Sequence, residues 1–322
     1  MSRTLSVIIP MFNEARHIAR TLEAVRKAAE SAACTWEVIV VDNGSSDDGP
    51  RIARERGAQV LVCPGISIGA LRNRGAALAQ GEWLAFLDAD MQVPENWLVT
   101  WSQVQAQNRA EVLGLVHRPP AQAPWYARAW LQRVGSAREQ AGLRDWLPTA
   151  NLCLPRSWFE RVGGFDETLR TGEDKDLSLR LGQAGARLLS LPDPAVLNWG
   201  FESNWSEWLG KELWRQCSHV QLLRKNGPSL RLLRFPLLAC GIWLLDLLAL
   251  IALVQQQWPA ALALFALGLA PALGLALRET YSRLAPRLTA QLWLLHWLRL
   301  HVTGAGLLFG LLNLTPRRPA RG

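Results

Sequence analysis

The sequence predicts an α/β domain with a mostly parallel sheet flanked by helices, followed by a C-terminal helical region that associates with a membrane. In the first ninety residues, short apolar runs alternate with segments of helical periodicity. From Leu232 onward, long apolar stretches replace the evenly spread charges of the preceding chain. We therefore expect an α/β domain over residues 1–205, an amphipathic connecting helix over 206–231 and membrane-associated helices over 232–322.

Four apolar runs in the N-terminal part predict strands, and the segments between them predict helices. The strands are expected at Leu5–Ile9, Glu37–Val41, Gln59–Val62 and Trp83–Leu87. The helices are expected around Ile18–Ala29, with Asn13 as a candidate N-cap, and at Gly49–Arg56 and Ile66–Ala79. Strands that alternate with helices form a parallel sheet covered on both faces, and ligands bind beyond the carboxyl ends of such strands.

Two carboxylates follow the fourth predicted strand. Asp88 and Asp90 lie one residue apart in the sequence Phe-Leu-Asp-Ala-Asp-Met. Carboxylates this close repel each other unless a cation lies between them, and a hard divalent ion such as Mn²⁺ or Mg²⁺ would also bridge phosphate oxygens. An ordinary acidic turn after a strand is the alternative interpretation.

Other polar and aromatic residues occupy the same predicted edge. Asp42 ends the second strand and could accept a hydrogen bond from a nucleobase or ribose, or it could simply form the turn that follows. Phe12 could stack on a base or serve in packing. Arg72 and Arg74 precede the fourth strand on a helix, where one of them could pair with phosphate; a solvated basic face is the alternative.

A second acidic segment, Gly172-Glu-Asp-Lys-Asp-Leu-Ser-Leu-Arg180, begins a predicted helix with an apolar face. Acids at a helix N-terminus interact favourably with the helix dipole, so capping alone could explain them. The functional interpretation makes Asp174 a general base that deprotonates an acceptor hydroxyl.

Five segments in this order carry a resemblance to a known family. They are Ser6–Glu14, Val41–Asp47, Arg72–Ala76, Phe86–Asp90, and Gly163–Asp166 together with Gly172–Asp174. Over roughly residues 4–200 the chain resembles the inverting family-two glycosyltransferases, which have the GT-A fold. The resemblance implies a sugar transfer from a nucleotide diphosphate sugar, expected to be a UDP-sugar, with help from Mn²⁺ or Mg²⁺.

The resemblance also implies roles for single residues. Asp90 would be the direct metal ligand, with Asp88 beside it, and Asp174 the catalytic base, with Glu173 next to it. Asn151 would line the acceptor side together with Glu173. The residues implied in nucleotide binding are Pro10, Phe12, Glu14, Asp42, Arg72 and Asp88.

One departure from the family pattern concerns the metal. Many relatives carry a His after the strand that follows the Glu-Asp helix, whereas this chain has Asn198. Either Asn198 is a weak substitute, or only Asp90 and phosphate oxygens hold the ion.

The expected acceptor is a hydroxyl of a lipid-linked or cell-envelope glycan. The alternatives are transfer to polyprenyl phosphate and a catalytically inactive, nucleotide-binding membrane scaffold. The presence of Asp88, Asp90 and Asp174 together argues against the scaffold. A dinucleotide-dependent oxidoreductase is disfavoured because Pro10-Met-Phe stands where a glycine-rich turn would follow the first strand.

The net charge of +8 points to a membrane rather than to nucleic acid. The basic residues form no dense tract interleaved with aromatics, and many of them flank the apolar tail, which suits the cytoplasmic face of a bilayer. The five cysteines are scattered and odd in number, so neither a disulfide framework nor a zinc site is expected. We expect an inner (cytoplasmic) membrane location with the catalytic domain facing the cytoplasm.

The tail contains three apolar stretches. Leu232–Val254 and Trp258–Leu277 are long enough to span a bilayer, and the uncharged turn Gln255–Gln257 would lie outside. Asp246 is costly in lipid and should face protein. The third stretch, Leu292–Leu312, carries His and Arg and is expected to lie in the interface or to re-enter. Trp205–Arg224 is expected to be an amphipathic helix on the membrane, with core packing as the alternative.

Overall fold

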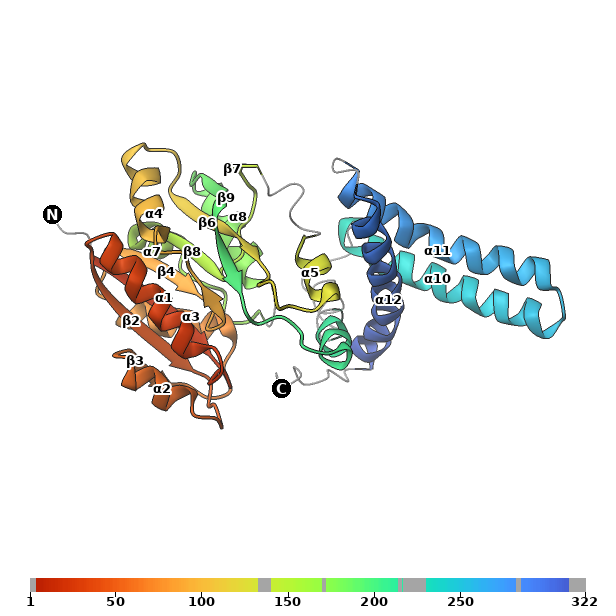
Figure 1. The fold of residues 1–322 in the computed structure, drawn as a ribbon, viewed down its shortest axis with the longest axis horizontal. Helices are drawn as coiled ribbons and strands as arrows, with labels where there is room; N and C mark the ends of the chain where they lie inside the picture. Colours follow the sequence, from red (N-terminus) through yellow and green to blue (C-terminus); the bar gives the residue numbers. More distant parts are fainter. Residues whose placement is uncertain are drawn as a thin grey trace. The chain divides into compact units, whose positions relative to one another are not determined.

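The computed structural model describes residues 4–132, 140–169, 172–213, 216, 230–281 and 285–312. The chain divides into two compact units. The first unit contains Met1–Gln122 and Ala137–Phe201, and the second contains Ala123–Ser136 and Glu202–Gly322. The segment 123–136 therefore groups with the C-terminal part of the chain, which the domain limits expected from the sequence did not include. Figure 1 draws both units.

The first unit is built on a nine-stranded sheet in the order β3-β2-β1-β4-β8-β6-β9-β5, with β7 paired to β9. The four N-terminal strands are parallel, as expected: β1 (Thr4–Met11), β2 (Thr35–Asp42), β3 (Gln59–Val62) and β4 (Trp83–Leu87). Seven of the eight residues of β1 are buried, because helices cover both faces of the sheet.

The rest of the sheet is mixed. Strand β8 (Asn151–Pro155) is antiparallel to both β4 and β6 (Val112–Arg118). Strand β9 (Leu188–Asn198) runs parallel to β6, whereas β5 (Met91–Gln92) and β7 (Gly142–Leu143) are antiparallel to β9. The parallel arrangement inferred from the first ninety residues thus applies to the N-terminal half of the sheet.

Alternate residues of the central strands face two separate cores, as the side-chain alternation of a strand requires. Val7 and Ile9 of β1 pack in one core with α1 (Ile18–Ser31), α2 (Gly49–Glu55) and α4 (Trp97–Ala106). Ile8 packs in the other with α3 (Ile68–Leu78), α7 (Arg156–Arg161) and α8 (Glu173–Gln183). Gly75 lets α3 approach β1 closely, since a Cβ there would lie 2.4 Å from Cγ2 of Ile8.

The prediction that Asn13 caps the first helix is wrong. The residue before α1 is His17, and no side chain caps the helix. Asn13 instead adopts a left-handed backbone conformation with φ of 54°, and its side-chain oxygen accepts a hydrogen bond from the backbone N–H of Ser46 at 2.8 Å. Asn13 therefore ties two loops together rather than starting a helix.

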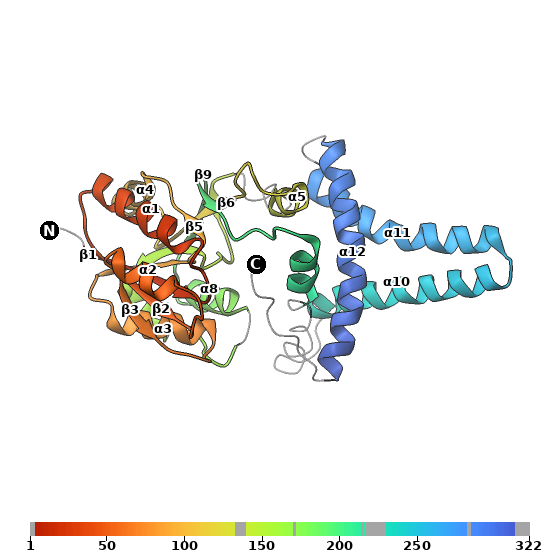
Figure 2. The same cartoon turned by 60° about the horizontal axis from the view of Figure 1, so that its bottom comes forward.

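The second unit is helical and contains α5 (Trp125–Gln132), a helix over 205–213, α10 (Leu230–Val254), α11 (Trp258–Thr280) and α12 (Pro286–Leu311). By length and composition, three of these helices could cross a membrane: α10 from Leu233, α11 and α12. In both Figure 1 and Figure 2, α10 and α11 form a hairpin and α12 runs across it rather than alongside it. Helix α12 is one continuous helix, and whether Leu292–Leu312 lies in the interface or re-enters stays a prediction.

Several ionisable groups of the apolar helices are paired, and Asp246 is one of them, as expected. The Asp246 carboxylate contacts His301 Nε2 at 2.8 Å, so it faces α12. His296 Nε2 of α12 lies 2.9 Å from Glu279 of α11, and the Arg299 guanidinium lies 3.4 Å from Glu212. Charged groups in apolar helices are costly unless they are paired in this way.

The connecting segment is described only in part. Within the helix over 205–213, Trp208 and Glu212 are buried, which agrees with the core-packing alternative, whereas Trp205 is 37% exposed. The remainder of Trp205–Arg224, apart from Gln216, lies outside the described residues. So do Lys225, Arg283, Arg317, Arg318 and Arg321, on which the expected membrane orientation partly rests.

Candidate active site

The ends of β2, β1 and β4 bring the predicted polar residues to one edge of the sheet. Asp42 lies opposite Met11 in the parallel register, so Phe12 and Asp42 emerge from adjacent strands. Strand β4 pairs with the other side of β1 and ends at Leu87, directly before Asp88. The expectation that these strand ends converge is therefore confirmed.

Asp42 is buried and organises the loop that follows it. One carboxylate oxygen accepts hydrogen bonds from the backbone N–H groups of Gly44 and Ser45, at 3.1 and 3.0 Å, and the other contacts the Ser45 hydroxyl. The turn-forming role considered for Asp42 is thus present. Its contact with a nucleobase or ribose stays a prediction.

The loop after β1 is joined to the loop after β2. The backbone N–H of Asn13 donates to the Ser45 hydroxyl, and that of Ala15 donates to the Asp47 carboxylate, both at 2.8 Å. Phe12 remains 50% exposed on this joined pair of loops, so packing does not account for its side chain. Of the other residues expected to bind the nucleotide here, Pro10 lies within β1 and Glu14 is buried.

Arg72 does not lie on a solvated basic face, and its pairing with phosphate stays a prediction. It is 2% exposed, so it does not belong to a solvated basic face, whereas Arg74 on the same helix is exposed. Its two terminal nitrogens donate to Asp88 and Glu173, each at 2.9 Å. These carboxylates hold the pKa of the Arg72 guanidinium above its usual value, although burial alone would lower it. Removing one partner from a buried ion pair typically costs about 3–5 kcal/mol.

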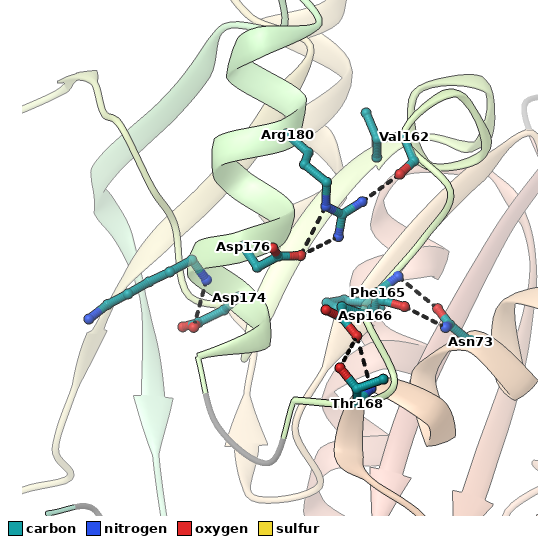
Figure 3. Close-up of polar contacts among 9 residues, drawn as sticks. Asn73, Val162, Phe165, Asp166, Thr168, Asp174, Asp176 and Arg180 are labelled. Carbon is teal, nitrogen blue, oxygen red and sulfur yellow. Dashed lines mark hydrogen bonds and ion pairs between the residues drawn. The ribbon is translucent and has the colours of Figure 1, made fainter. Parts of the chain in front are cut away.

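Asp174 follows Glu173 in the first turn of α8, where the sequence predicted an acidic helix start. Burial and, next, the Glu173 carboxylate raise the pKa of Asp174 to about 6, against the opposing effects of Arg72 and Lys175. The Asp174 carboxylate accepts a hydrogen bond from the backbone N–H of Lys175 at 2.8 Å (Figure 3). A carboxyl group with a pKa near neutrality is well suited to general base chemistry.

The segment that carries Asp88 and Asp90 is held by backbone contacts. The N–H of Asp88 donates to Ala150 O at 3.1 Å, and the Thr21 hydroxyl donates to Ala89 O at 2.7 Å. Asp90 is buried, and its carbonyl accepts from the N–H of Trp199 at 2.9 Å. Asn198, at the position where the family resemblance led us to look for a His, lies opposite Met91 in the β5–β9 ladder, and Met91 directly follows Asp90.

Among the described residues, no three His, Cys, Asp or Glu side chains are grouped so that they could hold a metal ion. A divalent ion would therefore have to be held by the carboxylates of Asp88 and Asp90 together with substrate phosphate, which stays a prediction. Mg²⁺ and similar ions are commonly bound by one or two carboxylates, with substrate phosphates and water completing the shell.

Asn151 was expected on the acceptor side, and the structure places its amide between two strands. Its oxygen accepts from the N–H of Leu115 at 2.8 Å, and its nitrogen donates to the carbonyl of Leu115 at 3.0 Å. The same nitrogen contacts His117 Nε2. Asn151 therefore joins β8 to β6 at the point where the β6–β9 register shifts, between Leu115 and His117.

Two contacts of this edge were not expected from the sequence. His117 comes from β6, outside the segments that carry the family resemblance, and it is positioned by Asn151. The pairing of Arg72 with Glu173 joins residues 101 positions apart. No local pattern indicates either contact, because each depends on which distant segments become neighbours.

Comparison with known proteins agrees with this arrangement. Residues 83–277 match glycosyl transferase family group 2, and residues 6–154 match glycosyl transferase family 2. The chain is 32% identical over 201 residues to a pre-mycofactocin glycosyltransferase of Mycobacterium tuberculosis, covering 58% of this chain but only 40% of that protein. It is 28% identical over 249 residues to glycosyltransferase AglE of Haloferax volcanii, covering 75% of this chain and 80% of that one.

A solved structure shares the fold. The mannosyltransferase PcManGT from Pyrobaculum calidifontis, solved with GDP-Man and Mn²⁺, superposes with a TM-score of 0.59 at 19% identity. The match covers 97% of this chain and 88% of that one. The expected GT-A fold is thus confirmed. Because a family match extends over more than half of the sequence, the chain belongs to the family-two glycosyltransferases, within glycosyl transferase family group 2.

Proposed function

We propose that this chain is an inverting, metal-dependent glycosyltransferase that moves a sugar from a nucleoside diphosphate donor to a hydroxyl of a lipid-linked or cell-envelope glycan. The observation that carries the proposal is the Arg72 bridge. It joins Asp88, at the end of β4, to Glu173, the residue before the candidate base Asp174. A donor-side carboxylate and the candidate base are thereby linked through one buried side chain.

In the proposed reaction, the acceptor hydroxyl attacks the anomeric carbon opposite the nucleoside diphosphate. The new bond to the acceptor oxygen forms as the bond to the phosphate oxygen breaks, so the anomeric configuration inverts. Asp174 takes the hydroxyl proton, for which a pKa of about 6 suits it at neutral pH. A bound Mn²⁺ or Mg²⁺, held by Asp90 and Asp88, would offset the charge on the departing diphosphate.

The donor is expected to be a UDP-sugar, with Phe12 beside the base and Asp42 at its polar edge. The exposed ring of Phe12 next to the Asp42 loop supports this assignment. The nucleotide and the sugar remain open to test, and GDP-Man in the structural neighbour makes a guanine donor the first competitor to include.

The three apolar helices support attachment to the inner membrane, with the catalytic unit on the cytoplasmic side. In this arrangement the α10–α11 hairpin enters the bilayer and its Gln255–Gln257 turn lies toward the outside. Helix α12 lies in the interface, which its crossing of the hairpin favours (Figure 2).

The proposal is tested with the purified full chain in lipid vesicles and a panel of UDP-sugars and GDP-Man. We expect nucleoside diphosphate release that stops on chelation of the metal and returns with Mn²⁺. Asp174→Asn should lose at least about 100-fold in rate because the base is gone. Asp176→Asn is the matched control, since Asp176 lies on the same helix but pairs with Arg180. Equal rates for Asp174→Asn and the parent chain would refute the catalytic assignment.

The acceptor is tested separately, because transfer to polyprenyl phosphate would need the same donor site. Lipid extracts of the reaction would contain a glycosyl phosphate, labile to mild acid, if the alternative holds. An acid-stable glycosidic product would support the proposed hydroxyl acceptor. A failure of every donor to react while nucleotide still binds would indicate the inactive scaffold.

A further inference from the structure

Arg72 is one of the largest fully buried side chains of the chain, and both ends of its fork are occupied. Its Nη1 donates to Glu173 and its Nη2 to Asp88, from segments that lie far apart in sequence. A planar guanidinium fixes the spacing of two carboxylates, since its N–H groups point in set directions. Arg72 therefore determines how far the donor-side loop lies from the start of α8.

The helix that carries Arg72 is itself locked to the loop before α8. The Asn73 side chain donates to the carbonyl of Phe165 and accepts from its N–H, both at 2.9 Å (Figure 3). The Ser67 hydroxyl donates to the carbonyl of Glu167 at 2.8 Å. Gly75, on the same helix, packs directly on β1. The Arg72 side chain thus projects from a rigid support.

A direct role for Arg72 in holding donor phosphate does not fit these contacts. A phosphate could take Nη1 or Nη2 only by displacing a carboxylate, which would leave Glu173 or Asp88 without its buried cation. Such an exchange is costly, because a buried charge needs a partner. The contacts fit a residue that acts through its two acidic neighbours.

We infer that Arg72 is a positioning residue: it holds Glu173 and Asp88 at a fixed separation and so sets the place and charge environment of Asp174 relative to the donor. The inference rests on the proposed function, in which Asp174 is the base. It assigns to Glu173 the role of a fixed negative charge beside that base, rather than that of a second proton acceptor.

The charges around Asp174 allow the arrangement to be tested through the pH dependence of kcat/KM. Glu173 raises the pKa of Asp174, whereas Arg72 from α3 and Lys175 from α8 lower it. Replacing Glu173 with Gln should therefore move the acidic limb of the pH–kcat/KM profile to lower pH. Replacing Arg72 with Met should move the limb to higher pH. A residue with only a structural role would not produce shifts of opposite sign.

The test measures the kinetics of four variants of the full chain with the best donor found in the panel. The variants are Glu173→Gln, Arg72→Met, Arg72→Lys and Lys175→Gln. We expect Arg72→Met to lose on the order of 100-fold in kcat with little change in donor KM, as for a misplaced base. Arg72→Lys keeps the positive charge but loses the two-pronged guanidinium. Its acidic limb should therefore lie at the same pH as in the parent chain, whereas its kcat should lie between those of Arg72→Met and the parent. Lys175→Gln should move the limb to higher pH and lower the plateau kcat less than Arg72→Met does, because its side chain contacts neither Glu173 nor Asp88.

The outcomes separate this inference from the proposed function. If Asp174→Asn retains activity, the base assignment fails, whatever Arg72 does. If Asp174→Asn is inactive while Arg72→Lys and Glu173→Gln leave both the limb and kcat unchanged, the positioning role is overturned. A rise in donor KM at unchanged kcat in Arg72→Lys would likewise overturn it and make Arg72 a phosphate ligand. Should Arg72→Met not fold, Arg72→Lys and Glu173→Gln still decide the question.

Discussion

The ionised carboxyl group of Asp174 should destabilise the folded chain at neutral pH. Burial and the Glu173 carboxylate raise its pKa from 3.8 to about 6. An acid with a raised pKa holds its proton more tightly in the folded state, so the folded state loses stability as the pH rises between these two values. The difference of about 2 pKa units corresponds to roughly 2–3 kcal/mol once the group is ionised in both states.

Asp174→Asn removes this charge while keeping nearly the same shape. We expect the free energy of unfolding at neutral pH to rise by roughly 2–3 kcal/mol. This gain in stability should shrink as the pH falls toward the pKa of a free Asp carboxyl group. The melting temperature should rise by several degrees, at about 2–4 °C per kcal/mol for a unit of this size. If Asp174 is the base, the same variant should lose transferase activity, so stability and activity should change in opposite directions.

The measurement is thermal unfolding of the purified chain in detergent at a series of pH values, followed by the fluorescence of its 16 Trp residues. Asp176→Asn is the matched control, because it breaks a partly exposed ion pair with Arg180, worth up to about 1 kcal/mol. The Asp176→Asn control should not have a higher melting temperature than the parent chain at neutral pH. The reasoning is refuted if Asp174→Asn is no more stable than the parent there, or if its gain is the same at acidic pH.

Three further outcomes follow from single contacts. Asp90→Asn should abolish the rise in melting temperature that Mn²⁺ plus nucleoside diphosphate gives the parent chain, and a retained rise would remove Asp90 from the metal site. Gly75→Ala should lower the free energy of unfolding, measured by denaturant titration, by about 1–3 kcal/mol, because its Cβ would overlap an isoleucine of β1; Gly182→Ala, with open space around its Cβ, should not. His301→Leu should destabilise the second unit in detergent by about 1–3 kcal/mol by removing the partner of the partly exposed Asp246 carboxylate, and Asp246→Leu in the same chain should restore the loss; additive losses would contradict the pairing.

The local features of the first unit could be predicted because they depend on short stretches of sequence. Strands β3 and β4 have the bounds expected from apolar runs of four and five residues, and α8 begins at the acidic turn. In each case the apolar period and its bounding turn residues act over a few positions. The family resemblance then supplied the fold, because the motif order covers about the same range as the first unit.

The contacts that build the site depend on pairings between distant segments. The insertion of β8 between β4 and β6, which places Asn151 against Leu115, is not visible in any local pattern. The contact of Arg72 with Glu173 could not be predicted, because nothing in the helix of Arg72 indicates a partner 101 positions away. A buried arginine implies buried carboxylates, but the sequence does not say which of 27 acidic residues they are.

If the site binds a divalent ion as proposed, its charge balance should couple donor binding to metal binding. Arg72 contributes one positive charge, which pairs with both Asp88 and Glu173. Two more carboxyl groups lie close to these acids in the sequence: Asp90 near Asp88, and Asp174 next to Glu173. A nucleoside diphosphate brings further negative charge into this acidic surrounding, and Coulomb repulsion at low effective dielectric opposes its entry. A divalent ion removes that opposition, so donor and metal should bind with positive linkage, each raising the affinity of the other equally. The Arg72 bridge offsets part of the negative charge of the site, and the proposed metal would offset the charge that the donor adds.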